Sequence, residues 1–462
     1  MFLYNTLTNR KEELQKSRKP IKLFVCGPTV YDYSHIGHGR TYIAFDTFVR
    51  YARSQGYKIS YLQNITDVDD KIIKRAAEKG VSALSLARTF TRAHFDDMKK
   101  LGVISVTKYA PATKFIPQIV KQVETLVARG YAYKISDGYY FDISKFKEYG
   151  KLSKRTVLQA EDAISRVDEN AEKRNKGDFC LWKFYKPGEP SWNTRLGKGR
   201  PGWHIEDTAI SEHFYGPQYD IHGGGIDLKF PHHEAEIAQQ EAASGKKPFV
   251  RIWMHTGFLL INNEKMSKSL GNFLTIRDFL KKHSALILRY LVLLHHYRSP
   301  FNYTETTIEQ AENGLQNLRL TLERLRFIEH SSKAKKSFEI KEFITAADRD
   351  FYRAMDDDFN TPEAVAALFK LITPLQNKLW LLSGAQAKEL SRFLLKKLEL
   401  LGIAFITSPA PLKARTLLKQ REKLRGNQQF IQADGLRKKL SALGFTVEDT
   451  PLGPFLWRTN QI

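Results

Sequence analysis

Hydrophobic and polar positions follow two different periods in the first 130 residues. Short apolar runs over 22–26 and 58–63 predict strands, and a helical period over 36–55 predicts a helix between them. A strand, a helix and a second strand in this order imply parallel strands joined by a right-handed crossover. Further helices are predicted over 69–79, 84–101 and 114–129. The opening of the chain is therefore expected to be α/β.

The pattern changes after residue 130. Apolar runs over 132–135 and 139–143 flank Ser136-Asp137-Gly138, a sequence typical of a hairpin turn. A polar and basic stretch follows as far as residue 200, and we interpret it as an insertion into a domain whose α/β pattern resumes near Trp203. Residues 304–403 carry leucines at helical spacing, and a basic unit follows the prolines at 409 and 411.

Composition limits the class of protein. Of the 462 residues, 42% are hydrophobic and 27% are charged, which is typical of a globular chain and not of a disordered or collagen-like one. The longest apolar stretch, 286–294, is much shorter than the roughly 20 residues that a membrane span needs. Charges at 10–13 interrupt any signal-peptide core, and two cysteines are too few for a disulfide framework. We expect a cytoplasmic protein with no membrane partner.

The charge balance is less ordinary. Lys and Arg number 73 against 50 Asp and Glu, which gives a net charge of +23. A surplus of this size attracts polyanions, and nucleic acid is the first candidate. The alternative is a basic proteome, in which every surface is shifted toward lysine.

Two short strings carry candidate chemistry. His35-Ile36-Gly37-His38 lies where the first strand passes into the first helix, the place where open α/β sheets bind nucleotides. The two imidazoles share one face of the helix and can donate hydrogen bonds to phosphate, while Gly27 and Gly37 allow a ligand to approach the backbone. Alone, such a histidine pair is usually a surface feature, and Lys265-Met266-Ser267-Lys268 is by default a solvated loop.

Together and in this order, the two strings resemble the signature motifs of class I aminoacyl-tRNA synthetases. The resemblance implies a Rossmann-type domain that holds ATP, with its Mg²⁺, between the two motifs, and a lysine loop that closes over the triphosphate. It implies catalytic roles for His35, His38, Lys265 and Lys268. It also implies that ATP is bound by Gly27, His35, Gly37, His38 and Lys268.

Beyond the motifs, the chain is similar to the cysteinyl-tRNA synthetase family over nearly its full length. The matching stretches are 24–32, 64–73, 177–183, 202–206, 220–236, 254–272, 353–362, 433–440 and 448–451. We expect an α/β fold: a Rossmann-type parallel-sheet catalytic domain with an insertion, followed by a helical-bundle domain and a small basic C-terminal domain. The expected boundaries are 1–130 with 201–300 for the catalytic domain, 131–200 for the connective insertion, 301–405 for the helical anticodon-binding domain and 410–462 for the C-terminal anticodon-recognition domain.

In that family a zinc ion distinguishes cysteine from serine, because a soft metal binds a thiolate strongly and an alcohol weakly. Carried over by position, the resemblance implies one zinc ion held by Cys26, Asp207, His232 and Glu236. Asp207 departs from the family pattern, which commonly has cysteine there; it keeps the negative charge but makes the site harder. The alternative is that the metal has been lost and Asp207 only forms hydrogen bonds.

The resemblance also implies a cysteine pocket. Its expected residues are Cys26, Thr66, Trp203, His222 and Asp227. Trp203 is either an aromatic wall of the pocket or a buried core residue. The three glycines at 223–225 would by themselves indicate a flexible turn, and Cys180 fits a small buried residue better than a metal ligand.

The end of the chain has the placement of the family's anticodon-binding domains. Basic residues expected on one helix face are Lys413, Arg415, Lys419, Arg421, Lys423 and Arg425. Phe455 and Trp457 are candidates for contact with unstacked anticodon bases. A helix with a solvated basic face is the alternative.

The resemblance implies a monomeric ATP-dependent ligase that converts L-cysteine to cysteinyl-adenylate, releases pyrophosphate, and transfers the cysteinyl group to the 3′-terminal adenosine of tRNA-Cys. Two other functions stay open at this point. A cysteine ligase that joins cysteinyl-adenylate to a small amine would lack the complete C-terminal tail. A non-catalytic tRNA-binding paralogue would show a degraded histidine or lysine motif, yet both strings are intact.

Overall fold

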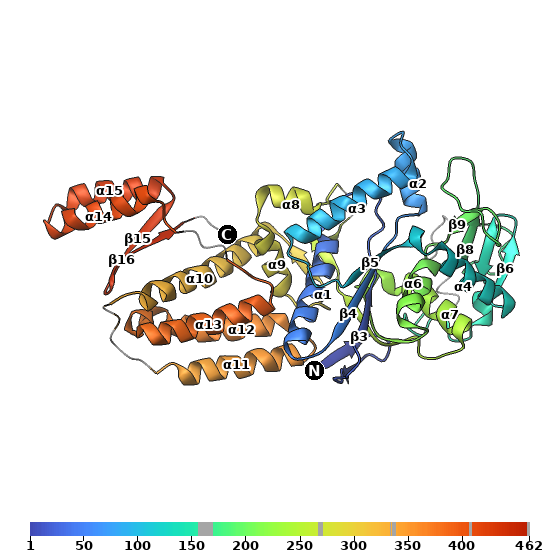
Figure 1. Ribbon diagram of the computed structural model, residues 1–462, viewed down its shortest axis with the longest axis horizontal. Coiled ribbons are helices and arrows are strands. Elements are labelled where there is room, and N and C mark those ends of the chain that lie inside the picture. Colours follow the sequence, from blue (N-terminus) through green and yellow to red (C-terminus); the bar gives the residue numbers. More distant parts are fainter. Residues whose placement is uncertain (156–169, 267–270, 333, 335–338, 406–408, 460–462) are drawn as a thin grey trace. The chain divides into compact units, whose positions relative to one another are not determined.

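A computed structural model describes residues 1–155, 170–266, 271–332, 334, 339–405 and 409–459 (Figure 1). The chain divides into two compact units, which are described separately. Unit 1 comprises Met1–Ala285, His296–Tyr303 and Asp357–Phe359. Unit 2 comprises Leu286–His295, Thr304–Asp356 and Asn360–Ile462.

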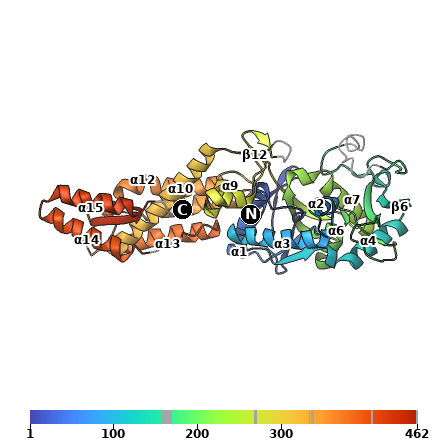
Figure 2. The same cartoon turned by 90° about the horizontal axis from the view of Figure 1, so that it is seen from above.

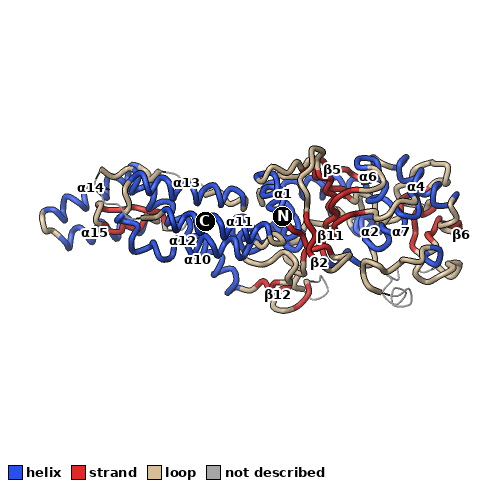
Figure 3. Tube along the Cα trace, turned by 90° about the horizontal axis from the view of Figure 1, so that it is seen from below, coloured by secondary structure: helices blue, strands red, loops and turns tan. Residues whose placement is uncertain are grey.

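A parallel sheet forms the centre of unit 1. Within the described residues its strands lie in the order β11-β10-β3-β4-β5, and every neighbouring pair is parallel. Figure 3 shows strands in red and labels the two edge strands, β11 and β5. The strands are β3 (Ile21–Val25), β4 (Ile59–Ile65), β5 (Lys108–Pro111), β10 (Tyr219–Gly225) and β11 (Val250–Thr256). Val25 pairs with Gln63 on one side and with Gly223 on the other. The strand order therefore changes direction between β3 and β10, which is where such sheets bind ligands.

The helices of unit 1 lie between these strands in the sequence, except α8, which follows the last of them. They are α1 (Ile36–Ser54), α2 (Asp70–Glu78), α3 (Ala83–Lys100), α4 (Ile116–Ala128), α6 (Ile205–Tyr215), α7 (His232–Ser244) and α8 (Ile276–Lys282), with short 3-10 turns η1 (Ala112–Lys114), η2 (Ile143–Lys145) and η4 (Ile226–Lys229). The strand–helix–strand unit predicted at the start of the chain is confirmed as β3, α1 and β4. The helix bounds differ from the predicted ones by one or two residues, as expected where helix ends fray.

Smaller sheets surround the central one. An antiparallel sheet runs through β6 (Ala132–Ile135), β7 (Gly138–Phe141), β8 (Phe179–Phe184) and β9 (Gly199–Pro201). The hairpin predicted after residue 131 is confirmed, although its second strand begins earlier, at Gly138. The remaining strands of unit 1 are β1 (Phe2–Asn5), β2 (Arg10–Glu13), β12 (Leu259–Ile261), β13 (Glu264–Lys265) and β14 (Phe301–Tyr303).

The main core of unit 1 lies between the sheet and helices α4, α6 and α7. Trp182 and Trp253 are fully buried in it, together with Phe24 and Phe141. Burying a side chain of this size stabilises the fold by about 2–3 kcal/mol relative to exposure. The core therefore fixes the C-terminal ends of β3 and β10, from which the functional residues extend.

Unit 2 is mainly helical. Its elements are α9 (Ala285–Leu293, whose first residue belongs to unit 1), α10 (Glu305–Glu329), α11 (Lys341–Asp356), α12 (Thr361–Leu375), η5 (Gln376–Leu381), α13 (Gly384–Leu400), α14 (Leu412–Gly426), α15 (Phe430–Ala442), β15 (Phe445–Thr450) and β16 (Gly453–Arg458). α10 packs against α13 (Figure 2), and α11 packs against α12 (Figure 1). The leucines predicted to share one face of a helix are buried on α10, as Leu315, Leu318 and Leu325 illustrate.

Two residues of the predicted RNA-binding surface are buried instead. Arg421 has no exposed surface and donates to both carboxylate oxygens of Asp449, at 2.7 and 2.8 Å. Phe455 is 3% exposed and packs against Phe327 and Trp380. Their expected contacts with RNA are therefore wrong, because helical spacing and residue type do not reveal which side of a small unit faces its own core. Across the described ranges, no helix combines the length and the hydropathy needed to cross a membrane.

Candidate active site

A cavity of about 310 Å³ lies at the C-terminal ends of the central strands of unit 1. Cys26 follows β3, Thr66 follows β4, and Gly225 ends β10. The candidate residues that line it are Cys26, Gly27, His35, Gly37, His38, Thr66, Trp203, Asp207, Asp227, His232 and Lys265. Segments far apart in the sequence thus meet at one site. Lys268 lies outside the described residues.

The two histidines of the first motif form the start of α1. His35 is the N-cap residue: its Nδ1 atom accepts from the backbone N–H of His38, and Nδ1 of His38 accepts from the N–H of His35, each at 3.3 Å. Their rings stack with centroids 3.7 Å apart. Burial, with a contribution from Lys71, lowers the pKa of His38 to about 4, so this ring is neutral at pH 7. Because each Nδ1 accepts a hydrogen bond, the proton of a neutral ring is on Nε2.

The two glycines near this motif make room for protein atoms. A Cβ on Gly37 would lie 2.9 Å from the His35 ring, and one on Gly27 would lie 1.7 Å from the carbonyl oxygen of Asn64. Both positions also border the cavity. The close packing of the histidine cap and of Asn64 therefore requires glycine here, in addition to any approach by a ligand.

The second motif reaches the cavity from the hairpin formed by β12 and β13. Lys265 ends β13, and its ammonium lies 4.8 Å from the centre of the Phe258 ring. Arg40 of α1 is buried and donates to the carbonyl oxygens of Gly257 at 2.7 Å and Tyr297 at 3.2 Å. These bonds connect the helix of the histidine motif to the segment that leads into the lysine hairpin.

Four buried side chains form the ligand group that the sequence analysis predicted. Their ligand atoms all lie within 4.8 Å of one another: Cys26, Asp207, His232 and Glu236. Nε2 of His232 lies 3.1 Å from Oδ2 of Asp207 and 2.9 Å from Oε1 of Glu236. His232 and Glu236 occupy successive turns of α7, as their spacing predicts.

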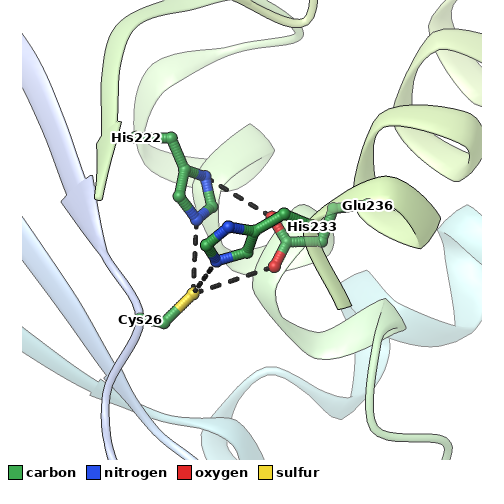
Figure 4. Close-up of side chains that lie close together, drawn as sticks. All are labelled: Cys26, His222, His233 and Glu236. Carbon is green, nitrogen blue, oxygen red and sulfur yellow. Dashed lines mark hydrogen bonds and ion pairs between the residues drawn. The ribbon is translucent and has the colours of Figure 1, made fainter. Parts of the chain in front are cut away.

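A second group shares two of these residues (Figure 4). Cys26 and Glu236 also lie within 4.8 Å of His222 and His233. Sγ of Cys26 is 3.2 Å from Nε2 of His222 and 3.1 Å from Nε2 of His233. His222, expected in the cysteine pocket, stacks on Trp253 behind Cys26 and does not line the cavity.

The electrostatics of this cluster fit a bound cation. Burial raises the pKa of the Cys26 thiol well above its usual value, and the carboxylates of Glu236 and Asp207 raise it further. Burial also raises the pKa of Glu236 to about 7, against the opposing effect of His232. Burial alone would lower the pKa of His232, but Glu236 and Asp207 outweigh it and raise this pKa to about 10. Acidic groups are crowded here in a dry site, where a divalent ion would relieve their repulsion.

Aromatic and polar residues complete the cavity wall. Trp203 is half-buried, lines the cavity and stacks on His232 with ring centroids 4.4 Å apart, so the aromatic wall is observed and the core tryptophan is not. Asp227 lies in η4 at the cavity edge. Cys180 is buried beside Tyr133 and Tyr140, away from the donor cluster, as expected of a small packing residue.

Several residues of the site were not singled out from the sequence. His233 contacts Cys26, and its Nδ1 lies 2.8 Å from Nε2 of His255. His204 approaches His232 at 2.8 Å, between their Nδ1 atoms. The spacing of His233 and Glu236 on α7 is a signal that was available. His204 and His255 meet His232 and His233 only in the folded chain, so no spacing in the sequence indicates these contacts.

Comparisons with known proteins cover the whole chain. Residues 12–313 match the family profile described as "tRNA synthetases class I (C) catalytic domain", and residues 350–405 match the DALR domain. The chain is 45% identical to a cysteine–tRNA ligase of Thermococcus onnurineus, covering 99% of this chain and 98% of the relative. It is 42% identical to a cysteine–tRNA ligase of Coxiella burnetii, covering 99% of this chain and 100% of the relative.

The fold has solved counterparts. A methionyl-tRNA synthetase of Mycobacterium tuberculosis, in complex with methionyl-adenylate, superposes with a TM-score of 0.64 at 16% identity, covering 83% of this chain and 91% of that one. This likeness concerns the fold alone, whereas the relatives above are similar in sequence over their whole length. The chain belongs to the cysteine–tRNA ligase family of class I tRNA synthetases.

Proposed function

We propose that this protein joins L-cysteine to tRNA-Cys in two steps. In the first, a carboxylate oxygen of cysteine attacks the α-phosphorus of ATP, and the bond to pyrophosphate breaks to give cysteinyl-adenylate. In the second, a ribose hydroxyl of the 3′-terminal adenosine attacks the carbonyl carbon, and AMP leaves. One observation carries this proposal. Three of the four side chains suited to bind a metal ion line the same cavity as residues of both nucleotide motifs.

The histidine and lysine motifs would stabilise charge on the phosphates. Nδ1 of His35 and Nδ1 of His38 each accept a backbone hydrogen bond at the helix start, so each ring carries its proton on Nε2 and can donate it. Lys265 and Lys268 would offset the charge of the leaving pyrophosphate, with Mg²⁺ accompanying ATP. Positioned donors and cations of this kind lower the barrier without a covalent enzyme intermediate.

For the metal site, we favour the group formed by Cys26, Asp207, His232 and Glu236. Cys26, Asp207 and His232 line the cavity, so a metal held there is accessible to substrate, whereas His222 and His233 do not line it. Zn²⁺ bound at this group would hold the substrate sulfur as a thiolate and bind the hydroxyl of serine weakly.

His222 fits a supporting role better than a ligand role. Its Nδ1 lies 2.6 Å from the hydroxyl of Tyr219, whose pKa is raised by burial, so the hydroxyl keeps its proton and can donate it. In that arrangement His222 carries its own proton on Nε2, directed at Sγ of Cys26. A donor in this position stabilises a thiolate on Cys26, and hydrogen bonds of this kind orient the ligands of a metal site.

The remaining assignments follow from the same proposal. Thr66, Trp203 and Asp227 would enclose the cysteine side of the cavity, with Asp227 near the substrate amine. The catalytic domain would comprise 1–130 and 201–300, with 131–200 as connective insertion. Residues 301–405 and 410–462 would bind the anticodon region. A monomer in the cytoplasm stays a prediction.

ATP–pyrophosphate exchange tests the first step, with cysteine and serine compared in parallel. Exchange supported by cysteine and at least about 100-fold weaker with serine is expected from a metal-based choice of thiol, since shape alone separates such isosteres by about that factor at most. Charging of tRNA-Cys tests the second step and separates this activity from ligation to a small amine. The absence of cysteine-dependent exchange by folded, metal-containing protein would refute the proposal.

A further inference from the structure

One cation at the cavity belongs to neither signature motif. Lys71 lies in the first turn of α2, is exposed, and lines the cavity. Its ammonium lies 5.8 Å from the centre of the Trp203 ring and 5.9 Å from that of Tyr31. Two aromatic rings on separate segments therefore lie close to this charge at the cavity edge.

The two neighbouring carboxylates each have other partners, although Asp69 is close enough to interact electrostatically with Lys71. Asp69 caps α2 by accepting from the backbone N–H of Lys71 at 2.8 Å. Asp70 forms ion pairs with Lys183 at 2.7 Å and Arg200 at 2.6 Å. Among the described residues, no carboxylate lies within ion-pair distance of the Lys71 ammonium.

Helix stability does not account for a lysine at this position either. The N-terminal turn of a helix favours negative charge and disfavours positive charge, because its free N–H groups point outward. Lys71 stands in that turn of α2. Lys71 is thus unfavourable for the helix, forms no ion pair with any carboxylate that the structure describes, and lines the cavity. This is the arrangement expected of a lysine that binds an anionic ligand.

Lys71 lies between the two sides of the cavity, since its charge acts on His38 of the nucleotide motif and its ammonium also approaches the metal side. Trp203, which the ammonium approaches, stacks on His232 of the donor group at 4.4 Å. Lys265 instead approaches Phe258 on the lysine hairpin. In cysteine only Cβ and Cα separate the sulfur from the carboxylate, so a substrate whose sulfur is at the donor group keeps its carboxylate close to Trp203.

We infer that Lys71 binds the carboxylate of the amino acid substrate and orients it for attack on the α-phosphorus of ATP. The inference rests on the proposed function, since it takes the thiol end of the substrate to be at the donor group. In the attack, a carboxylate oxygen forms the new bond to phosphorus while the pyrophosphate oxygen leaves with its electron pair. Lys71 keeps its proton throughout and stays beside the resulting acyl phosphate.

Direct binding of two ligands tests this role without turnover. L-cysteine and cysteamine share the thiol and the amine, and cysteamine lacks the carboxylate. Calorimetric titration of metal-containing wild type and Lys71→Ala with each ligand is expected to show cysteine weakened about 10- to 100-fold in the variant, as for the loss of a charged hydrogen bond. Cysteamine is expected to change less than about threefold. Metal content measured on the same samples shows that the donor group is intact.

Two further variants sharpen the result. Lys74→Ala removes an exposed lysine one turn along α2 that does not line the cavity, and it is expected to bind both ligands as wild type does. Lys71→Arg keeps the charge and is expected to recover part of the affinity for cysteine. In pyrophosphate exchange, Lys71→Ala should raise the KM for cysteine more than the KM for ATP.

The outcomes separate this inference from the proposed function. An equal loss for cysteine and cysteamine, or no loss for either, overturns the role of Lys71 while wild-type exchange leaves the proposed function standing. A loss of ATP affinity alone assigns Lys71 to phosphate and overturns the carboxylate assignment. Wild-type protein that neither binds cysteine nor supports exchange overturns both.

Discussion

The side-chain amide of Asn64 donates a hydrogen bond to Oδ1 of Asp207. The carbonyl oxygen of the same amide accepts from the backbone N–H of Gly27 at 2.6 Å, which fixes its orientation. Oδ2 of Asp207 is then left 3.1 Å from Nε2 of His232. An aspartate can therefore stand where the family commonly has cysteine, with one oxygen held by the protein and the other available to a metal ion.

Removing a ligand from this group should remove the metal. Cys26→Ser and Asp207→Ala are each expected to lower bound zinc from close to one per chain to below ~0.2 after dialysis, because three remaining ligands hold the ion much less tightly. Elemental analysis of purified protein measures this. Cys180→Ser is the matched control, since Cys180 lies in a different cluster. Equal zinc in all four proteins would contradict the site.

The hydrogen bond from Asn64 should matter to metal affinity although Asn64 is not a ligand. Asn64→Ala frees Oδ1 of Asp207 and is expected to weaken zinc binding about 10- to 100-fold, the usual effect of removing a residue that orients a ligand. Competition with a chromophoric chelator measures the affinity. Asn193→Ala removes an exposed amide that does not line the cavity and should leave the affinity within about threefold of wild type. If both variants weaken binding equally, the hydrogen bond is not the cause.

His94 should make unit 1 sensitive to mild acid. It is buried, Nδ1 lies 3.0 Å from Oγ of Ser34, and burial, with His38, lowers its pKa from 6.5 to about 3. Between these values the unfolded chain binds one proton more than the folded chain, so the free energy of unfolding falls as pH falls. For this group the loss is about 1.4 kcal/mol per pH unit, or about 2 kcal/mol from pH 6.5 to pH 5.

Urea unfolding at pH 7 and pH 5 measures that contribution. His94→Gln should show a pH dependence smaller than wild type by about 2 kcal/mol over this interval. His330→Gln, which changes an exposed histidine, is the control and should keep the wild-type dependence. Parallel behaviour of wild type and His94→Gln would show that the buried ring is not what responds to acid.

The basic helix α14 should contribute to RNA affinity through its exposed face alone. Lys419 and Lys423 are exposed, and replacing both with Ala is expected to weaken binding of tRNA-Cys and to reduce its salt dependence by roughly one unit per lost phosphate contact. Filter binding at several salt concentrations measures both quantities. Arg421→Ala should instead lower the stability of unit 2 by about 1–3 kcal/mol, because Asp449 loses its partner. An unchanged salt slope in the lysine variant would exclude this face.

Much of the fold was accessible from the sequence, because local pattern and tertiary structure agree there. The strands and helix around His35 follow directly from apolar runs and helical periods. The three glycines at 223–225 are the opposite case: alone they suggested a flexible turn, yet they lie at the end of β10. Glycine is required in this strand because Phe45 and His233 occupy the space next to it, and these contacts cannot be read from the sequence.

The candidate site divides in the same way. The resemblance supplied all four expected ligands, and the spacing of His232 and Glu236 adds only that these two share a helix face. Asn64 acts through Asp207, which is distant in the chain, so no local pattern marks it. Phe455 was misassigned because its alternation along β16 does not tell a surface from the core of a small unit.

The three glycines at the end of β10 limit which substitutions this enzyme can accept. A methyl group on Gly223 would fall 2.2 Å from the Phe45 ring, and one on Gly224 would fall 2.9 Å from the ring of His233. A side chain at either position would therefore displace Phe45 or His233, so a single substitution there disturbs the packing behind the cavity. Changes in substrate preference are more accessible at Trp203, in the turn before α6, and at Lys71, in the first turn of α2, because both side chains line the cavity.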